Sequence, residues 1–226
     1  MQRLAFLLIF GLGGAGILIG LGVWQIQRLA WKQNIIAEID GRISAAPVAL
    51  PTLLDPTRDA YLPVDVTGVL GIEYLQVLVS QKGAGAGYRI IRPMIRETDR
   101  IMIDMGFVSI ANATGLRFQE GPSVTITGNL QWPDETDSFT PEADIDGNIW
   151  FARDVSLMAE TLNTNPVLVV RRSAPQSGGP LSPLPVDTSA IPNDHLQYAI
   201  TWFSLAAIWS TMTFFFLRRR SAANIS

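Results

Sequence analysis

The chain passes from a polar segment into an apolar one at Pro192-Asn193-Asp194-His195-Leu196-Gln197-Tyr198-Ala199-Ile200-Thr201-Trp202-Phe203. The uncharged run extends from Tyr198 to Leu217, about the 20 residues that a helix needs to cross the hydrocarbon core of a bilayer. Asn193 or Asp194 can cap this helix at its start. The only histidine of the chain, His195, is therefore predicted at a membrane–water boundary.

Two interpretations of this boundary follow from its residue types. Helical spacing places four side chains on one face, at i, i+3, i+4 and i+7: His195, Tyr198, Ala199 and Trp202. Tyrosine and tryptophan collect at membrane surfaces, which favours a simple interface anchor. Histidine is also the commonest metal ligand, which favours a ligand site. The spacing alone does not decide between them.

A second uncharged apolar run, from Leu4 to Val23, follows the N-terminal Met1-Gln2-Arg3. It is longer than the apolar core of a signal peptide, and no small-residue cleavage site follows it, so we expect an uncleaved transmembrane helix. Gly16 and Gly20 form a G-x-x-x-G step that lets another helix approach closely. We expect this step to face the small residues of the other span, Ala199, Ala206 and Thr213.

The charges that flank the two runs predict the topology. Arg218-Arg219-Arg220 follows the second run directly, which predicts a cytoplasmic C-terminus, and two spans then place the N-terminus inside as well. The absence of an Arg- and Ser-rich transit sequence favours a bacterial protein of the inner (plasma) membrane. The expected order is cytoplasmic residues 1–3, a span at 4–23, a periplasmic domain at 24–197, a span at 198–217 and a cytoplasmic tail at 218–226.

The composition of the central segment excludes several functions. Residues 24–197 contain 13 Lys and Arg against 20 Asp and Glu, a net charge of −7, whereas nucleic-acid binding needs a basic surface. The chain has no cysteine, which excludes disulfides, thiol nucleophiles and thiolate-ligated metals. One histidine cannot form a multi-histidine metal site within one chain. These absences leave little for catalysis, so we do not expect an enzyme.

Residues 24–43 are expected to extend the first helix beyond the membrane. Trp24 and Trp31 lie one heptad apart with Arg28 between them. They are either an aromatic belt with a snorkelling cation or a surface for an amphipathic ligand, whose carboxylate the guanidinium would bind.

The remaining domain is expected to be β-rich over residues 61–172, with an extended linker at 173–192. Alternating apolar residues and turn signals predict one helix at 156–162 and about seven short strands, at 61–67, 74–80, 88–96, 101–109, 124–130, 149–153 and 167–172. The predicted fold class is an α+β membrane protein, with two transmembrane helices flanking an antiparallel barrel- or sandwich-like extracytoplasmic domain. The acidic stretch at 134–146 is expected to be a solvated loop; the alternatives are a cation site or a docking face for a basic partner.

Several motifs resemble the surfeit-locus assembly factors of cytochrome c oxidase, the Surfeit-one or Shy-one family. Two of them are long and specific: Gly22-x-Trp24-Gln25-x-x-Arg28-x-x-Trp31-Lys32 and Asn193-Asp194-His195-Leu196-Gln197-Tyr198-Ala199-x-Thr201-Trp202-Phe203. Shorter ones lie between them: Tyr61-x-Pro63-Val64, Gly87-Tyr88, Arg92-Pro93, Gly106-Phe107-Val108 and Gly128-Asn129-Leu130. One departure is visible, because Met105 stands where the family usually has a basic residue.

The resemblance implies a haem a carrier that helps to load subunit I of the oxidase, with haem a synthase as a further partner. On that basis His195 is the expected axial ligand of the haem iron. Tyr198 and Trp202 would line the same helix face, and Trp24, Gln25 and Arg28 would face them from the first helix. Arg28 as a partner of a haem propionate is an inference from its chemistry. The alternative is a membrane-anchored scaffold that stabilises an oxidase assembly intermediate without binding haem. The sequence leaves open whether haem lies within one chain or between copies in a homo-oligomer.

Overall fold

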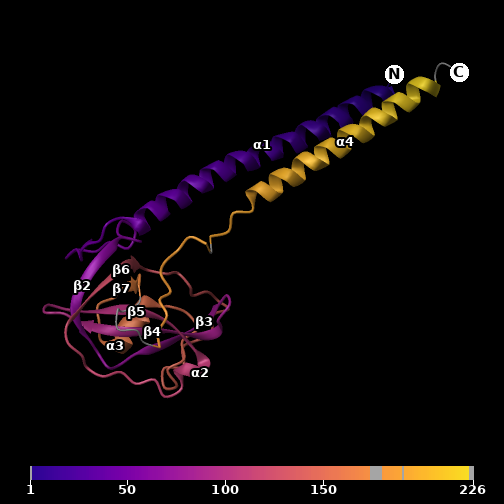
Figure 1. Cartoon of the computed structure of the whole chain (residues 1–226). Helices are drawn as coiled ribbons and strands as arrows, with labels where there is room; N and C mark the ends of the chain where they lie inside the picture. The colour runs from indigo at the N-terminus through magenta and orange to yellow at the C-terminus, as the bar shows by residue number, and fades with distance from the viewer. Residues whose placement is uncertain (1, 174–179, 190, 224–226) are drawn as a thin grey trace. The chain divides into compact units, whose positions relative to one another are not determined.

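The computed structural model describes residues 2–173, 180–189 and 191–223. It divides the chain into two compact units, one formed by Met1–Glu38 with Thr188–Ser226 and the other by Ile39–Asp187. The first unit is a helix pair and the second is a β domain (Figure 1). Parts of the predicted linker at 173–192 and of the predicted tail at 218–226 lie outside the described residues.

The helix pair consists of α1 (Gln2–Ser44) and α4 (His195–Ala223). Each contains a stretch that is long and apolar enough to cross a membrane, Ile9–Ser44 in α1 and His195–Arg218 in α4. The expected extension at 24–43 is part of one uninterrupted helix. Helix α4 begins at the histidine, and the backbone N–H of Tyr198 donates to the carbonyl oxygen of Asp194 at 3.1 Å.

The β domain is a small barrel. Its strands are β1 (Val48–Ala49), β2 (Pro63–Leu70), β3 (Leu75–Gln81), β4 (Gly85–Ile95), β5 (Arg100–Ser109), β6 (Val124–Gln131) and β7 (Leu168–Arg171). They form one sheet in the order β1-β2-β6-β7-β5-β4-β3. Strand β2 pairs with β6 along most of its length and with β4 at Val69↔Ile95 and Leu70↔Met94. Five strands therefore close into a ring, and β1 and β3 lie outside it.

The hydrophobic core consists of two clusters, one inside the ring and one on its outer face. All five ring strands contribute to the first cluster, which includes Val64, Ile90, Ile103, Leu130 and Val169. The second cluster covers the outer face of β3, β4, β5 and β7, where α3 (Val155–Leu162) packs against it. Strand β5 has both faces buried, so its residues are apolar almost throughout instead of alternating.

The structure corrects several sequence predictions in the β domain. The segment Ile149–Arg153 is not a strand, because only isolated bridges form at Ile149 and Trp150, while the seventh strand is β1. The sheet is mixed, since β1–β2 and β5–β7 are parallel. Strand β4 starts at Gly85, three residues before the predicted strand at 88–96. The short helix α2 (Ile110–Ala113) was not predicted, whereas α3, which Asp154 caps, begins one residue before the predicted helix at 156–162.

The last turn of α1 is held within the β domain by side chains from β6 and from the residue after β7. The guanidinium of Arg172 donates to the carbonyl oxygens of Ile43 and Ala45, and the buried Asn129 donates to that of Ile43 at 3.1 Å. Arg172 also donates to Asn129 Oδ1 at 2.9 Å. These contacts satisfy carbonyls that a helix leaves without partners at its C-terminal end.

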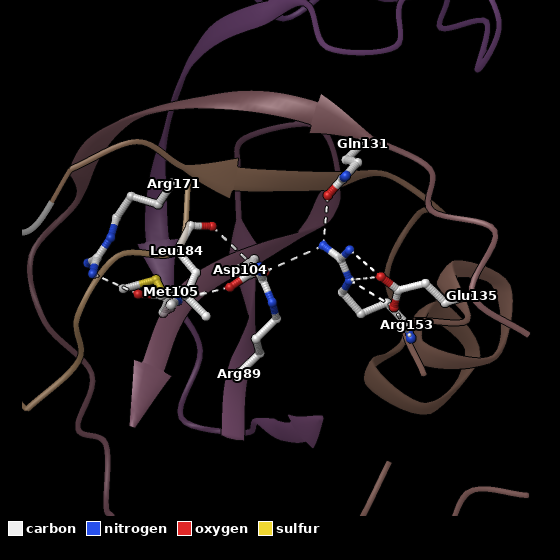
Figure 2. A network of polar contacts seen from close by, with 9 residues as sticks. Arg89, Asp104, Met105, Gln131, Glu135, Arg153, Arg171 and Leu184 are labelled. Carbon is white, nitrogen blue, oxygen red and sulfur yellow. Dashed lines mark hydrogen bonds and ion pairs between the residues drawn. The ribbon is translucent and has the colours of Figure 1, made fainter. Parts of the chain in front are cut away.

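A buried ionic network lies beside the start of α3 (Figure 2). The side chain of Asp104 is fully buried and forms an ion pair with Arg89, while Arg153 lies 4.0 Å away. Arg153 pairs in turn with Glu135 and donates to Gln131 Oε1 at 2.7 Å. Burial lowers the pKa of nearby Arg171, which donates to the Met105 carbonyl oxygen at 2.7 Å. The position that departs from the family pattern, Met105, is thus a core position in this chain.

Folding of the β domain is expected to depend on pH through Asp59. The side chain of Arg58 donates to its carboxylate at 2.8 and 2.7 Å, and this hydrogen bonding lowers the pKa of Asp59 to about 2. A carboxyl with a lowered pKa in the folded state stabilises the fold above its ordinary pKa of 3.8, and the stabilisation is lost as the pH falls toward 2. We expect Asp59→Asn to flatten the fall of the unfolding temperature between pH 4 and pH 2. Asp146→Asn, at an exposed site, is the control, and equal profiles for Asp59→Asn and the unmodified chain would contradict the assignment.

Candidate functional site

Helices α1 and α4 pack against one another along a seam with heptad spacing. On α4 the least exposed positions are His195, Ala199, Trp202, Ala206, Trp209 and Thr213. On α1 they include Gly11, Leu18, Gly22, Gln25, Leu29 and Lys32. Alternating steps of three and four residues are the pattern of coiled-coil packing. Gly11 of α1 lies against Thr213 of α4, and Gln25 lies against His195. Residue numbers that increase along α1 are thus matched by numbers that decrease along α4, so the two helices are antiparallel.

The glycines that allow the close approach are not the predicted ones. Nothing lies within 4 Å of a side chain added at Gly16 or Gly20, so these two face away from α4. A Cβ at Gly14 would lie 2.6 Å from Trp209, and one at Gly22 would lie 2.7 Å from Phe203. The prediction of a small-residue stripe on α4 was correct, because Ala199 and Ala206 are buried and Thr213 lies against Gly11.

His195 and Gln25 form a hydrogen-bonded pair in the seam. Nδ1 of His195 lies 2.7 Å from Oε1 of Gln25, and the Gln25 residue is 8% exposed. A carboxamide oxygen can only accept, so Nδ1 donates to it, and in the neutral ring this leaves the lone pair on Nε2. This arrangement is typical of metal-binding histidines, whose second nitrogen donates to an oxygen that fixes the ring and its tautomer. The pair therefore fits a ligand site for a metal that takes one imidazole.

Aromatic and cationic side chains lie along one edge of the helix pair. Trp24, Arg28 and Trp31 each immediately precede a seam residue of α1, and Tyr198 immediately precedes Ala199 on α4. Both helices are right-handed and run in opposite directions, so the residues before the seam fall on the same edge of the pair. We call these four residues the aromatic edge. Trp24 is 50% and Tyr198 is 55% exposed, and Arg28 Cζ lies 4.3 Å from the ring centre of Trp31.

The structure thus groups the predicted site residues in two sets. Gln25, His195 and Trp202 lie in the seam, whereas Trp24, Arg28 and Tyr198 lie on the exposed edge beside it. Tyr198 lies three residues after His195 on α4 and is 55% exposed, whereas His195 lies in the seam. Trp31 also lies on the edge, and the sequence left open whether it belongs to an aromatic belt or to a surface for an amphipathic ligand.

The acidic stretch at 134–146 holds no cluster of three metal-ligating carboxylates or histidines, and neither does any other described part of the chain. The carboxylate of Asp144 accepts from the backbone N–H of Gly147 at 2.9 Å, which forms a local turn. Sequence reasoning missed the network around Asp104, whose members come from different strands and loops with no recognisable spacing.

Two apolar helices that carry a barrel-like β domain between them define the class of this protein. The model of the SURF1 family matches residues 13–207, so the chain belongs to that family. The resemblance deduced from the sequence motifs is thereby confirmed.

The relatives come from animals and from bacteria. A SURF1-like protein of Drosophila melanogaster is 31% identical over 84% of this chain and 71% of its own length. The human Surfeit locus protein 1 is 30% identical over 86% of this chain and 72% of its own length. A SURF1-like protein of Rickettsia felis is 29% identical and covers 92% of this chain and 95% of its own length.

Proposed function

We propose that this protein is a non-enzymatic assembly factor of cytochrome c oxidase that binds haem a and passes it to subunit I. The observation that carries the proposal is the 2.7 Å contact between His195 Nδ1 and Gln25 Oε1. It orients the only imidazole of the chain with Nε2 available as an axial ligand. Membership of the SURF1 family supports the same function.

The residues around the pair fit a large, flat, apolar group that carries carboxylates. Trp202 lies in the seam one heptad after His195, and Trp24, Trp31 and Tyr198 offer aromatic surface on the edge. Arg28 lies on the same edge, where its guanidinium can bind a propionate. Haem a would supply an iron centre for which His195 provides one nitrogen ligand. A single protein ligand suits a carrier, because the cargo has to leave.

The proposal includes a location. The two apolar helices would anchor the protein in the bacterial inner membrane, with both termini in the cytoplasm and the β domain in the periplasm. Subunit I and haem a synthase would be its partners in the membrane. The chain has no cysteine, so a single Leu53→Cys in the β domain can be labelled selectively. Labelling of intact spheroplasts by a membrane-impermeant maleimide is expected; labelling only after lysis would contradict the orientation.

Replacing His195 with alanine is expected to abolish haem binding, because no other histidine can ligate the iron. The measurement is the visible spectrum of protein purified from cells that make haem a, in which the unmodified chain should show a Soret band. Gln197→Ala, an exposed position on the same helix turn, is the matched control. A Soret band that His195→Ala leaves unchanged would exclude the ligand assignment. No band in the unmodified chain would favour the scaffold function without haem.

Replacing Gln25 with alanine is expected to weaken haem binding without abolishing it. The variant removes the acceptor for Nδ1–H, and loss of such a supporting contact typically lowers metal affinity roughly tenfold to a hundredfold. Titration of haem into the purified apoprotein measures the change. Gln25→Glu keeps an acceptor and should retain the affinity, and Gln27→Ala, outside the seam, serves as the control. Equal affinities for Gln25→Ala and Gln27→Ala would contradict the role of Gln25.

A further inference from the structure

The β domain has a hollow of about 420 Å³ between the loop at 136–145 and the start of α3. Its apolar lining includes Ile145, Trp150, Phe151 and Leu157. Trp150 is fully buried in the cluster under α3, and its indole Nε1 has no hydrogen-bond partner in the described part of the chain. A buried donor of this kind normally has an acceptor, so Nε1 is an unsatisfied group in the core beside the hollow.

The rim of the hollow is acidic. It is formed by Asp137, Glu142 and Asp154. Residues 134–154 contain seven Asp and Glu against one basic residue, Arg153, which is already paired with Glu135. This stretch therefore supplies most of the excess negative charge of the central segment.

Two of the rim carboxylates are fixed in place. Asp137 accepts from the backbone N–H groups of Phe139 and Thr140, both at 2.9 Å, and the first of these bonds contributes most to lowering the pKa of Asp137. Asp154 caps α3 by accepting from Ser156 and Leu157, both at 3.1 Å. Preformed carboxylates lose little conformational freedom when a cation binds them.

A solvent-exposed phenylalanine lies next to residues that line the hollow. Phe139 lies in the turn between Asp137 and Thr140, which both line the hollow, and its side chain is 90% exposed. Aromatic residues in such positions are typical anchors of protein interfaces. A fully exposed phenylalanine next to an apolar hollow with an acidic rim is suited to a partner that is apolar and cationic at once.

We infer that this hollow, together with Phe139, is a docking surface for a basic segment of a partner protein that carries apolar side chains between lysines or arginines. The apolar side chains enter the hollow against Phe151 and Leu157, and the basic side chains bind the rim carboxylates. The surface is separate from the His195–Gln25 pair and belongs to the other unit of the chain.

Binding of a defined peptide to the full-length protein in a neutral detergent tests this surface. The probe is a hexapeptide with leucine and phenylalanine at its centre and two lysines on each side, and the comparison peptide has glutamates instead of lysines. Because the chain has no cysteine, an environment-sensitive dye can be attached at Ser138→Cys, beside Phe139, or at Leu53→Cys, which does not line the hollow. We expect a saturable response to the lysine peptide at position 138 only, and none to the glutamate peptide.

Substitutions separate docking from general charge attraction. In the chain labelled at position 138, Phe139→Ser and Glu142→Lys should each weaken the affinity for the lysine peptide at least tenfold. Glu97→Lys changes the net charge equally at an exposed turn outside the hollow and should have little effect. Equal weakening by Glu97→Lys and Glu142→Lys, an equal response at position 53, or no saturable binding would overturn the inference. The Soret band of haem-loaded protein should be the same in Glu142→Lys, so failure here is distinguishable from failure of the haem site.

Discussion

Replacing Asp104 with alanine is expected to destabilise the β domain by about 3–5 kcal/mol, the usual loss when one partner of a buried ion pair is removed. Its carboxylate is fully buried between Arg89 and Arg153, and it also accepts from the backbone N–H of Gly106 at 2.9 Å (Figure 2). The variant leaves the largely buried guanidinium of Arg89 without its carboxylate partner, while Arg153 keeps its pair with Glu135. Small domains have total stabilities of only about 5–15 kcal/mol, so much of the population is expected to unfold.

Chemical denaturation of the full-length protein, followed by far-ultraviolet circular dichroism of the β domain, measures this loss. The matched control is Asp99→Ala, because Asp99 pairs with Arg96 at 3.1 Å in the turn between β4 and β5, where both side chains are partly exposed. Pairs of that kind contribute less than about 1 kcal/mol. Similar losses for Asp99→Ala and Asp104→Ala would show that burial of the network does not determine its importance.

Replacing Gly106 with alanine is expected to cost at least about 2 kcal/mol and to release the segment around Ser182. Gly106 has a φ of +103°, which side-chain-bearing residues rarely adopt, and an added Cβ would collide with the carbonyl oxygen of Ser182. That oxygen accepts from Phe107 N–H at 2.6 Å, and Ser182 N–H donates back to Phe107 at 2.9 Å. The added Cβ would therefore disturb the two hydrogen bonds that hold Ser182 against β5.

The control for Gly106→Ala is Gly83→Ala, which separates backbone strain from collision. Gly83 has a similar φ of +88°, but nothing lies within 4 Å of an added Cβ. Amide hydrogen exchange should become faster at Ser182 and Phe107 in Gly106→Ala and stay unchanged there in Gly83→Ala. Equal protection of Ser182 in the unmodified chain and in Gly106→Ala would contradict the close approach.

The helices were easier to predict than the details of their contact. A run of about 20 uncharged residues is a signal that depends only on composition, so both apolar helices were recognised. The glycines of α1 that face α4 are those at the seam positions of the heptad pattern. The contact with α4 determines which residues occupy these positions. The sequence offers both Gly16 with Gly20 and Gly11 with Gly14, and only the packed pair distinguishes them.

The same limit applies to the β domain. Strands β2 and β6 were recognisable because one face is apolar and the other polar. Strand β5 is buried on both faces and has no alternation, but its continuous apolar run was still predicted within one residue of its bounds. Ile149 and Trp150 have the composition of a strand, but each forms only an isolated bridge, and Trp150 packs in the cluster under α3. Of the candidate site, the motifs pointed to His195 and Gln25, but the hydrogen bond between them requires two helices separated by 170 positions in the sequence.

The closure of the barrel ring has a consequence for the biosynthesis of the protein. Strand β2 leaves the ribosome early, but its register with β6 runs from Pro63↔Asn129 to Gly68↔Val124, so its main partner is made about sixty residues later. Until then only its two residue pairs with β1 and its two with β4 are available to it. The nascent chain therefore carries a largely unpaired strand with one apolar face for several seconds at ordinary rates of translation. During that interval the strand is exposed to chaperones and proteases, and completion of β6 ends the exposure.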